Sequence, residues 1–600
     1  MRKVVCLMLA AGALCFGGTS HSKISPDFRN SIGSGMTQVI VQWNGPMSPV
    51  TAQEISNLGG TVVSEMPAVQ LGVYLVPGSA VPALSSNPNV KYVSPDRQIH
   101  KKLAVAAAAI NAPSVWKSGF VGTGVGVAIV DSGVNADPNL NSGKDPIYVE
   151  DFVNPIPLNS DGKPGPKPNS YGLDWYGHGQ HIAGIIASNG KDSNCNQCNK
   201  TFIGIAPGAN IIDLKVLDSN GEGSDSAVIA AINRAIQLRK TYNIRVMNLS
   251  LGRNVYESYT EDPLCQAVEA AWKAGITVVV AAGNEGRDNS FGNDGYGTIT
   301  SPGNDPYVIT VGAMKTEGTP TRTDDLIASY SSKGPTAIDH IVKPDIVAPG
   351  NQMVSLLAQH GTLAMSNPQN VTALEAFQYP APKPGNFGNQ HAMPNDPNAQ
   401  PPGVAIPGGY SHSYYMLSGT SMAAAVVSGA AADLIQAAPS LTPDQVKYLL
   451  MQTASKTFPV SSTVVDQTSG QIYTDYYDIF TIGAGYIDLR AAMAAINQAP
   501  SGLTALSPVA NYDGATGDVE LSFDPSSIFA NKALWGTNST WGQSVLTGNK
   551  ALWGTSAIWG ASSDAGQKAL WGTNAIWSSK ALWGTSDASA SESVATTGEQ

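Results

Sequence analysis

The sequence predicts an α/β fold, a parallel sheet with helices on both faces. Between about residues 110 and 495, short apolar runs such as "GVGVAIVDSG", "IRVMNLSLG" and "TVVVAAGNEG" alternate with helical patterns such as "SDSAVIAAINRAIQLRKT". Strand–helix alternation of this kind indicates parallel strands joined by crossover helices. The apolar runs are nearly continuous, which is typical of strands that are buried on both faces.

Length and composition limit the class of protein. At 600 residues the chain is too long for one core, so we expect several modules. Charged residues are 13% of the chain, about half the usual share, and apolar residues are 42%. A net charge of -11 without a long Lys/Arg run argues against nucleic-acid binding.

Residues 1–22 read as a secretory signal peptide. Two basic residues precede an apolar run of roughly fifteen residues, followed by small polar residues. The run is shorter than the roughly twenty residues that a membrane-spanning helix needs. We therefore expect a secreted protein, extracellular or at the cell surface.

Residues 23–105 predict a small α+β unit. The runs "TQVIVQW", "GTVVSEM", "LGVYLV" and "VKYVS" read as strands. A helical pattern, "SPVTAQEISNLGG", follows the first strand, and "GSAVPALSSNPN" holds a short helix before the last. The expected order is β-α-β-β-α-β. The segment "HKKLAVAAAA" after it reads as a linker into the α/β module, which we place at residues 106–495.

The chain after this module has a different composition. Residues 496–530 form a Pro/Gly/Ser/Asp-containing connector, which we expect to be a linker. Residues 531–600 are a repeat tail in which "KALWGT" occurs four times and which holds seven of the eleven tryptophans. Two interpretations stay open. The rings form an exposed array that binds a cell surface or a polysaccharide, or the tail is a glycine-rich spacer.

Three cysteines follow the signal peptide. Cys195 and Cys198 form a C-x-x-C pattern in a polar loop, and Cys265 stands alone. In an exported protein a local disulfide is the favoured interpretation. Half of a zinc site and a redox motif are the alternatives.

Ser421, in "LSGTSMAAAVVSG", lies where a polar turn becomes a helix. An isolated Ser at this position would be a helix cap. A nucleophilic Ser needs a His base and a third group to orient that base. Asp131 ends the apolar run in "VAIVDSG", and His178 opens a helical pattern in "YGHGQHIAG". The chain order is therefore Asp, His, Ser.

The motifs "DSGV", "GHGQHIAG", "NLSLG", "AAGNEG", "SPGN" and "SGTSMAAAVVSG" resemble those of the subtilisin-like serine proteases, in that family's order over residues 110–495. The resemblance implies that Ser421 attacks a peptide carbonyl, that His178 takes its proton and that Asp131 orients His178. Asn284 and the Ser421 N–H would form the oxyanion hole. It also implies a secreted endopeptidase made as a self-cleaving zymogen, in which residues 23–105 are the inhibitory propeptide.

The resemblance implies substrate-binding residues as well. An extended peptide would lie as an added strand between the segments Ser250–Gly252 and Asn220–Ser224. The segments Ser250–Gly252, Ala281–Gly283 and Ser301–Gly303 would wall the primary pocket. The substrate-binding residues are therefore expected to be Ser250, Leu251, Gly252, Gly223, Ala282, Gly283 and Gly303. Glu285 would lie near the mouth of the primary pocket. We expect self-cleavage between residues 100 and 105, with Lys102 in that pocket.

The sequence also departs from the family pattern. Gln180 replaces a usual Thr, and Ala425 replaces a usual Pro. Asn139 stands where many relatives have a calcium-ligating Asp, so the metal-binding residues stay unassigned. No cofactor is expected for the chemistry, and a structural calcium ion remains compatible with the family. Residues 351–412 are an insertion with no assigned role.

Two other functions remain alternatives to a general endopeptidase. The first is a surface-binding protein whose tryptophan repeats dominate. The second is a processing protease of narrow specificity. The expected partners are a protein or peptide substrate and the chain's own propeptide.

Overall fold

The computed structural model describes residues 23–24, 35–45, 49–66, 70–95, 102–140, 146–157, 165–289, 293–378, 406, 409–466, 470–513, 518–530 and 598–599. The chain divides into two compact units, residues 1–99 and 100–600. The expected signal peptide and the tryptophan repeats lie outside the described residues. Both therefore stay predictions.

The first unit is a four-stranded antiparallel sheet with two helices. Its elements are β1 (Met36–Trp43), α2 (Pro49–Asn57), β2 (Thr61–Met66), β3 (Leu71–Pro77), α3 (Val81–Ser86) and β4 (Val90–Pro95). The strands lie in the order β2-β3-β1-β4. Along β1, Val39, Val41 and Trp43 alternate with less buried residues and enter the unit's core. The expected β-α-β-β-α-β order is confirmed.

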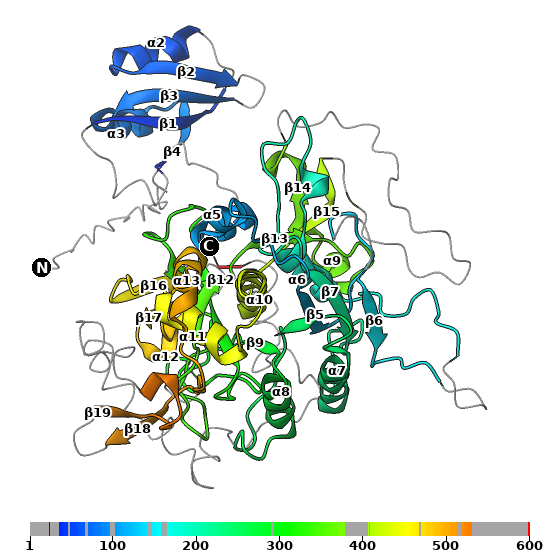
Figure 1. Ribbon diagram of the computed structural model, residues 1–600. Coiled ribbons are helices and arrows are strands. Elements are labelled where there is room, and N and C mark those ends of the chain that lie inside the picture. Colours follow the sequence, from blue (N-terminus) through cyan, green and yellow to red (C-terminus); the bar gives the residue numbers. More distant parts are fainter. Residues whose placement is uncertain are drawn as a thin grey trace, which may run out of the picture. The chain divides into compact units, whose positions relative to one another are not determined.

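The second unit is built on a mostly parallel sheet (Figure 1). Its strands are β5 (Gly126–Asp131), β6 (Tyr148–Asp151), β7 (Asn210–Lys215), β8 (Ile244–Leu249), β9 (Thr277–Ala281), β10 (Ile309–Lys315), β11 (Leu326–Ile327) and β12 (Ile346–Pro349). The order is β11-β10-β9-β8-β5-β7-β6, with β12 beside β10. Within the described part of the sheet, only the β10–β11 pair is antiparallel. Every residue of β5 is buried, as expected for a strand that is covered on both faces.

Helices cover the two faces of this sheet. Helices α6 (His178–Ala187) and α10 (Thr420–Ala437) contact each other and pack on one face. Helices α7 (Asp225–Leu238) and α8 (Pro263–Lys273) contact each other and pack on the opposite face (Figure 1). Helix α10 passes through the core, because its first sixteen residues are all buried. The α/β fold expected from the sequence is confirmed.

Smaller elements surround the main sheet. The helices are α4 (Lys102–Ala109), α5 (Ala112–Trp116), α9 (Thr362–Ser366), α11 (Pro443–Thr453), α12 (Ile479–Ile482) and α13 (Leu489–Ala494). A separate sheet has the order β13-β15-β14, with β13 (Met353–Leu356), β14 (Val371–Ala373) and β15 (Tyr410–Leu417). A hairpin joins β16 (Ser461–Val465) and β17 (Ile472–Tyr476). The expected insertion 351–412 thus supplies two strands of the separate sheet and part of a third.

Two segments that we expected to be linkers are structured. The segment after residue 100 forms α4, which contacts β13. Within residues 496–530, β18 (Val509–Asp513) and β19 (Asp518–Ser522) form a hairpin. Ile528 and Phe529 are buried in the main core. The polar and Gly-containing composition of this segment hid these few widely spaced apolar residues.

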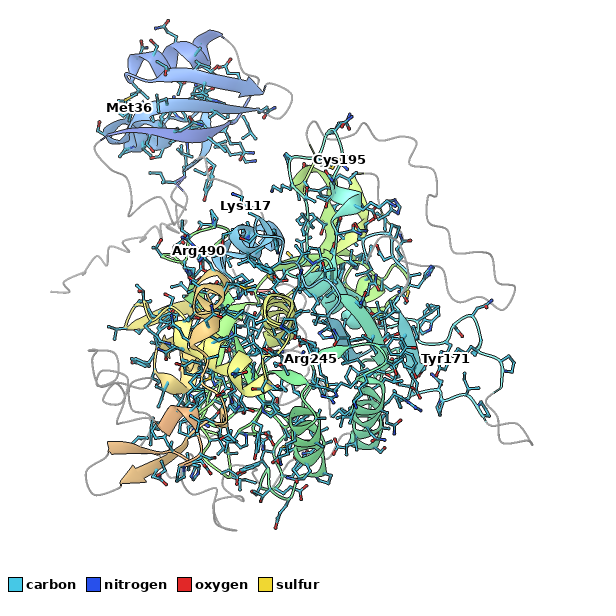
Figure 2. The ribbon with its side chains drawn as sticks, viewed as in Figure 1. Met36, Lys117, Tyr171, Cys195, Arg245 and Arg490 are labelled. Atoms are coloured by element: carbon cyan, nitrogen blue, oxygen red, sulfur yellow. A yellow bond between two sulfur atoms is a disulfide. The ribbon has the colours of Figure 1, made fainter. Side chains whose placement is uncertain are left out.

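The predicted disulfide between Cys195 and Cys198 is present. Figure 2 labels Cys195 in the region of β14 and β15, and Cys198 forms a backbone bridge with Gln378 there. Cys265 is a free, buried thiol, and its burial raises its pKa. We therefore expect Cys265 to be chemically inert. In the described part of the chain, no helix combines the length and the apolar character needed to span a bilayer.

Candidate functional site

Asp131 and His178 form a buried pair at the carboxyl edge of the main sheet. Asp131 is the last residue of β5, and His178 is the first residue of α6. The His178 Nδ1 lies 2.8 Å from the Asp131 Oδ1 and 3.0 Å from the Oδ2. Neither side chain is exposed. A neutral imidazole that donates from Nδ1 carries its lone pair on Nε2, so this contact selects the tautomer that a general base needs.

Ser421 lies inside helix α10 instead of capping it. The N-cap is Gly419, whose φ of 150° belongs to a region that favours glycine. The Ser421 Oγ donates to the Ser250 carbonyl at 3.2 Å, and the Ser250 Oγ donates to the Ser421 carbonyl at 2.9 Å. Helix α10 contacts α6, which begins at His178. Ser421 is therefore not the N-cap of this helix, and the helix-cap interpretation is wrong.

Asn284 is held beside Ser421 by a residue that the sequence did not single out. The Asn284 Oδ1 accepts from the Thr420 backbone N–H at 2.9 Å and from the Thr420 Oγ at 3.1 Å. The Thr420 Oγ also accepts from the Gly283 N–H at 3.2 Å. Because both bonds go to the amide oxygen, the Nδ2 group remains to donate elsewhere. The one sequence signal for Thr420 was its place directly before Ser421.

A pocket next to Ser421 collects most of the expected substrate-binding residues. It is lined by Ser250, Leu251, Gly252, Ala281, Gly283, Asn284, Glu285, Thr300, Thr420 and Ser421. Thr300 was missed because it lies one residue before the "SPGN" motif. A Cβ at Gly252 would lie 2.4 Å from the Thr300 Oγ, so only glycine fits this wall without a shift of Thr300. The pocket is therefore formed by glycines packed against threonine.

Three expected substrate residues are not among those that line this pocket. Ala282 is buried, and its N–H donates to the Val311 carbonyl beside the pocket wall. Gly303 is buried too, and a Cβ there would lie 3.0 Å from the Ala281 and Thr300 carbonyl oxygens. Gly223 lies in the loop before α7 and is half-buried. Their roles in substrate binding stay predictions.

Glu285 gives the pocket an acidic group. Its Oε2 accepts from the Asn284 N–H at 2.8 Å and from the Ser332 Oγ at 3.1 Å. Its Oε1 is buried and has no hydrogen-bond partner among the described residues. Burial raises the pKa of this carboxyl above its ordinary value. The Oε1 therefore offers an unused acceptor in the same pocket as Ser421.

His181, three residues after His178, has a structural position. Its Nε2 lies 3.1 Å from the Met353 carbonyl and 3.2 Å from the Tyr415 carbonyl. Burial and the neighbouring His178 lower the pKa of His181 to about 3, so it is neutral near pH 7. These contacts between the His181 ring and two backbone carbonyl groups connect helix α6 to strands β13 and β15.

The residues around Asn139 do not fit a calcium ion. The Asn139 Nδ2 donates to the Asp137 Oδ1 and to the Asp192 Oδ2, both at 2.8 Å. The Gln180 Nε2 donates to the other Asp137 oxygen at 3.2 Å. Amide N–H groups thus occupy the positions between carboxylates that a cation would need. In the described part of the chain, no group of three His, Cys, Asp or Glu residues is placed to hold a metal.

Comparisons with known proteins give a consistent result. A model of the subtilase family matches residues 122–473. The chain is 34% identical to serine protease AprX of Bacillus subtilis (strain 168) over 389 residues, 64% of this chain and 73% of AprX. It is 29% identical to subtilisin E of the same strain over 405 residues, 67% of this chain and 80% of that protein. The segment matched by the family model includes Asp131, His178, Asn284 and Ser421.

Proposed function

This chain belongs to the subtilase family of serine endopeptidases, and we propose that it cleaves peptide bonds through a triad of Asp131, His178 and Ser421. The observation that carries the triad is the buried contact between the His178 Nδ1 and the Asp131 carboxylate at 2.8 Å. A carboxylate at Nδ1 stabilises the imidazolium that forms when the ring accepts a proton at Nε2.

The proposed reaction begins when the Ser421 Oγ attacks the substrate carbonyl carbon and passes its proton to the His178 Nε2. The resulting oxyanion accepts hydrogen bonds from the Ser421 backbone N–H and the Asn284 Nδ2. His178 then protonates the leaving amine as the C–N bond breaks, which leaves an acyl-enzyme on Ser421. Water repeats the sequence, releases the acid and restores the Ser421 hydroxyl.

We propose that the pocket lined by Leu251, Gly252 and Glu285 binds the side chain on the acyl side of the cleaved bond. The buried Glu285 Oε1, which lacks a hydrogen-bond partner among the described residues, supports a preference for a cationic side chain such as Lys. Ser250–Gly252 and the loop with Gly223 would hold the substrate backbone as an added strand.

We further propose that the protein is secreted as a zymogen. The apolar N-terminal run supports secretion. Residues 23–105 would be the inhibitory propeptide, and the separate compact unit of residues 1–99 supports that assignment. Self-cleavage would fall between residues 100 and 105. The catalytic domain, expected at residues 106–495, would then include the hairpin at residues 509–522.

The test is purification of the full chain beside a Ser421→Ala variant, followed by N-terminal sequencing and a mixed-peptide digest. The unaltered protein should start between residues 100 and 105 and hydrolyse peptides. The Ser421→Ala protein should do neither. A Ser421→Ala protein that matures by itself in vitro would rule out the triad, and a mature start beyond Val121 would rule out the proposed boundary.

A further inference from the structure

Glu599 is buried in the second unit although it lies seventy residues beyond Phe529, a buried core residue that precedes the tryptophan repeats. Its carboxylate Oε2 accepts from the Ser329 N–H at 2.8 Å. Its Oε1 lies 3.4 Å from the Arg287 Nη2, and Glu599 is 5% exposed. The charge is therefore matched by a cation and a backbone donor, as a buried carboxylate requires.

The backbone of the same residue is bound as well. The Asn351 Oδ1 accepts from the Glu599 N–H at 2.9 Å, and the Asn351 Nδ2 donates to the Glu599 carbonyl at 2.7 Å. One side-chain amide thus satisfies both polar groups of one peptide residue. This pairing involves only backbone atoms of Glu599, so the preference for an acid must come from the contacts of its side chain with Arg287 and Ser329.

Gly598 adds a second element of selectivity. Its φ is 69°, a conformation that favours glycine. A Cβ on Gly598 would lie 2.4 Å from the Gln352 Cγ and 2.6 Å from the Ser418 Oγ. A larger residue would have to displace both side chains. The surface formed by Arg287, Ser329, Asn351, Gln352 and Ser418 therefore fits the dipeptide Gly-Glu.

This surface is connected to the turn that precedes helix α10, the helix that carries Ser421. The Ser418 Oγ accepts from the Gln352 N–H at 2.8 Å, and the Gly419 N–H donates to the Gly350 carbonyl at 2.9 Å. Gly350 and Asn351 both donate backbone N–H groups to the Met314 carbonyl. Binding of Glu599 to Asn351 thus adds a contact to the turn that supports the segment before Ser421.

We propose that Arg287, Ser329, Asn351 and Ser418 form a peptide-binding site for an acidic Gly-Glu segment, and that its occupant is Gly598–Glu599 of the same chain. Phe529 is buried in the main core, so described residues on both sides of positions 531–597 are bound to the second unit. The site stabilises the turn at Gly350–Gln352. It depends on no assumption about peptide hydrolysis.

Hydrogen–deuterium exchange of the full chain tests the site, with Ser421→Ala in every sample to prevent self-digestion. The variants are Glu599→Ala, Gly598→Val, which keeps the carboxylate, and Glu592→Ala as a matched control in the same tail segment. The readout is the exchange rate of the Ser329 amide, which donates to Glu599. Because no hydrolysis is measured, failure of the peptidase proposal would not affect the result.

Glu599→Ala and Gly598→Val should each speed exchange of the Ser329 amide by about tenfold or more, the effect of losing about 1.4 kcal/mol of protection. Glu592→Ala should match the parent. The proposed site is overturned if either of the first two variants keeps the parent's protection, or if Glu592→Ala loses as much protection as Glu599→Ala.

Discussion

The Asp131 carboxylate contacts the His178 Nδ1 with both oxygens, at 2.8 and 3.0 Å, in a region from which solvent is excluded. The Asp131 Oδ1 also accepts from the Ser132 N–H at 2.8 Å, which gives the carboxylate a further hydrogen bond that restricts its rotation. Strand β5 and helix α6 therefore hold the Asp131 and His178 side chains in contact, with little rotational freedom. Such preorganisation lets a base act without paying for reorientation during the reaction.

We expect Asp131→Asn to lower kcat by about 10⁴-fold, because an amide at this position permits the wrong His178 tautomer. Ser421→Ala should lower kcat by about 10⁶-fold, the magnitude measured for such a change in a subtilisin. Steady-state kinetics on a fluorogenic peptide measures both. A variant Asp131→Asn with kcat near that of the parent would remove Asp131 from the triad.

Asn284→Ala should lower kcat by about 10²–10³-fold with little change in KM, the effect measured for an oxyanion donor in a subtilisin. Thr420→Val removes the hydroxyl bonded to the Asn284 Oδ1 but keeps the Thr420 backbone N–H bond at 2.9 Å. We therefore expect a smaller loss of kcat from Thr420→Val. If Asn284→Ala raises KM and spares kcat, Asn284 binds substrate instead of stabilising the transition state.

The charge of Glu285 should make the preference for Lys over Leu depend on pH. Burial raises the Glu285 pKa above its ordinary value of 4.5, so as the pH falls this carboxylate takes up a proton, and loses its charge, at a higher pH than a free glutamate does. For two peptides that differ only in Lys or Leu, the Lys/Leu ratio of kcat/KM should fall by about fivefold when Glu285 becomes protonated, since a partly exposed ion pair contributes about 1 kcal/mol. The ratio cancels the titration of His178, which both substrates share.

Glu285→Gln is the matched variant for this measurement, because its amide keeps the shape of the carboxylate. Its Lys/Leu ratio should be low and independent of pH. A Glu285→Gln enzyme that retains the parent's pH-dependent ratio would assign the preference to another group.

Asp325 should make the folded protein less stable as the pH rises. It is 3% exposed, and burial raises its pKa from 3.8 to about 7. Between these two values the folded state holds a proton that the unfolded state has released, so the free energy of unfolding falls as the pH rises. Above about pH 7 this contribution stops changing.

Asp325→Asn should flatten the dependence between about pH 4 and 7 and should be more stable than the parent at pH 8. Asp324→Asn, at the exposed neighbouring position, is the control. Urea unfolding in a Ser421→Ala background measures the free energy of unfolding. Some slope will remain, because burial also raises the Asp305 pKa to about 7. Parallel curves for Asp325→Asn and the parent would contradict the prediction.

The sequence predicted those parts of the site that depend on local pattern. Asp131 ends an apolar strand, His178 opens a helix and Ser421 follows a glycine turn, and the resemblance of the surrounding motifs to the subtilisin-like proteases singled these three residues out. Thr420 was missed because its role depends on Asn284, which is 136 residues away. A threonine beside a serine has no distinguishing pattern of its own.

Long-range packing explains the other differences. Ile528 and Phe529 join the main core from a segment with a loop-like composition, so an expected linker became part of the second unit. Glu599 follows a low-complexity repeat, and nothing in its neighbours indicated that Arg287 and Ser329 would bind it. In both cases the contact joins segments that are far apart in the chain, and the local sequence pattern of neither segment indicates the other.

A chain ending at Ala530 should hydrolyse small peptides at a rate similar to that of the full chain. It keeps Phe529 in the core and every residue that lines the pocket next to Ser421, but it loses the tryptophan repeats and Glu599. Its Tm should be lower, because the contacts of Glu599 with Ser329 and Asn351 are absent.

The chain ending at Ala530 should also lose retention on cells or polysaccharide if the exposed-array interpretation of the tail is correct. The full chain with Glu599→Ala separates the two effects, since it should share the lower Tm and keep the retention. A truncated chain that folds but no longer hydrolyses small peptides would place the tail in the catalytic fold and contradict the boundary at residue 530.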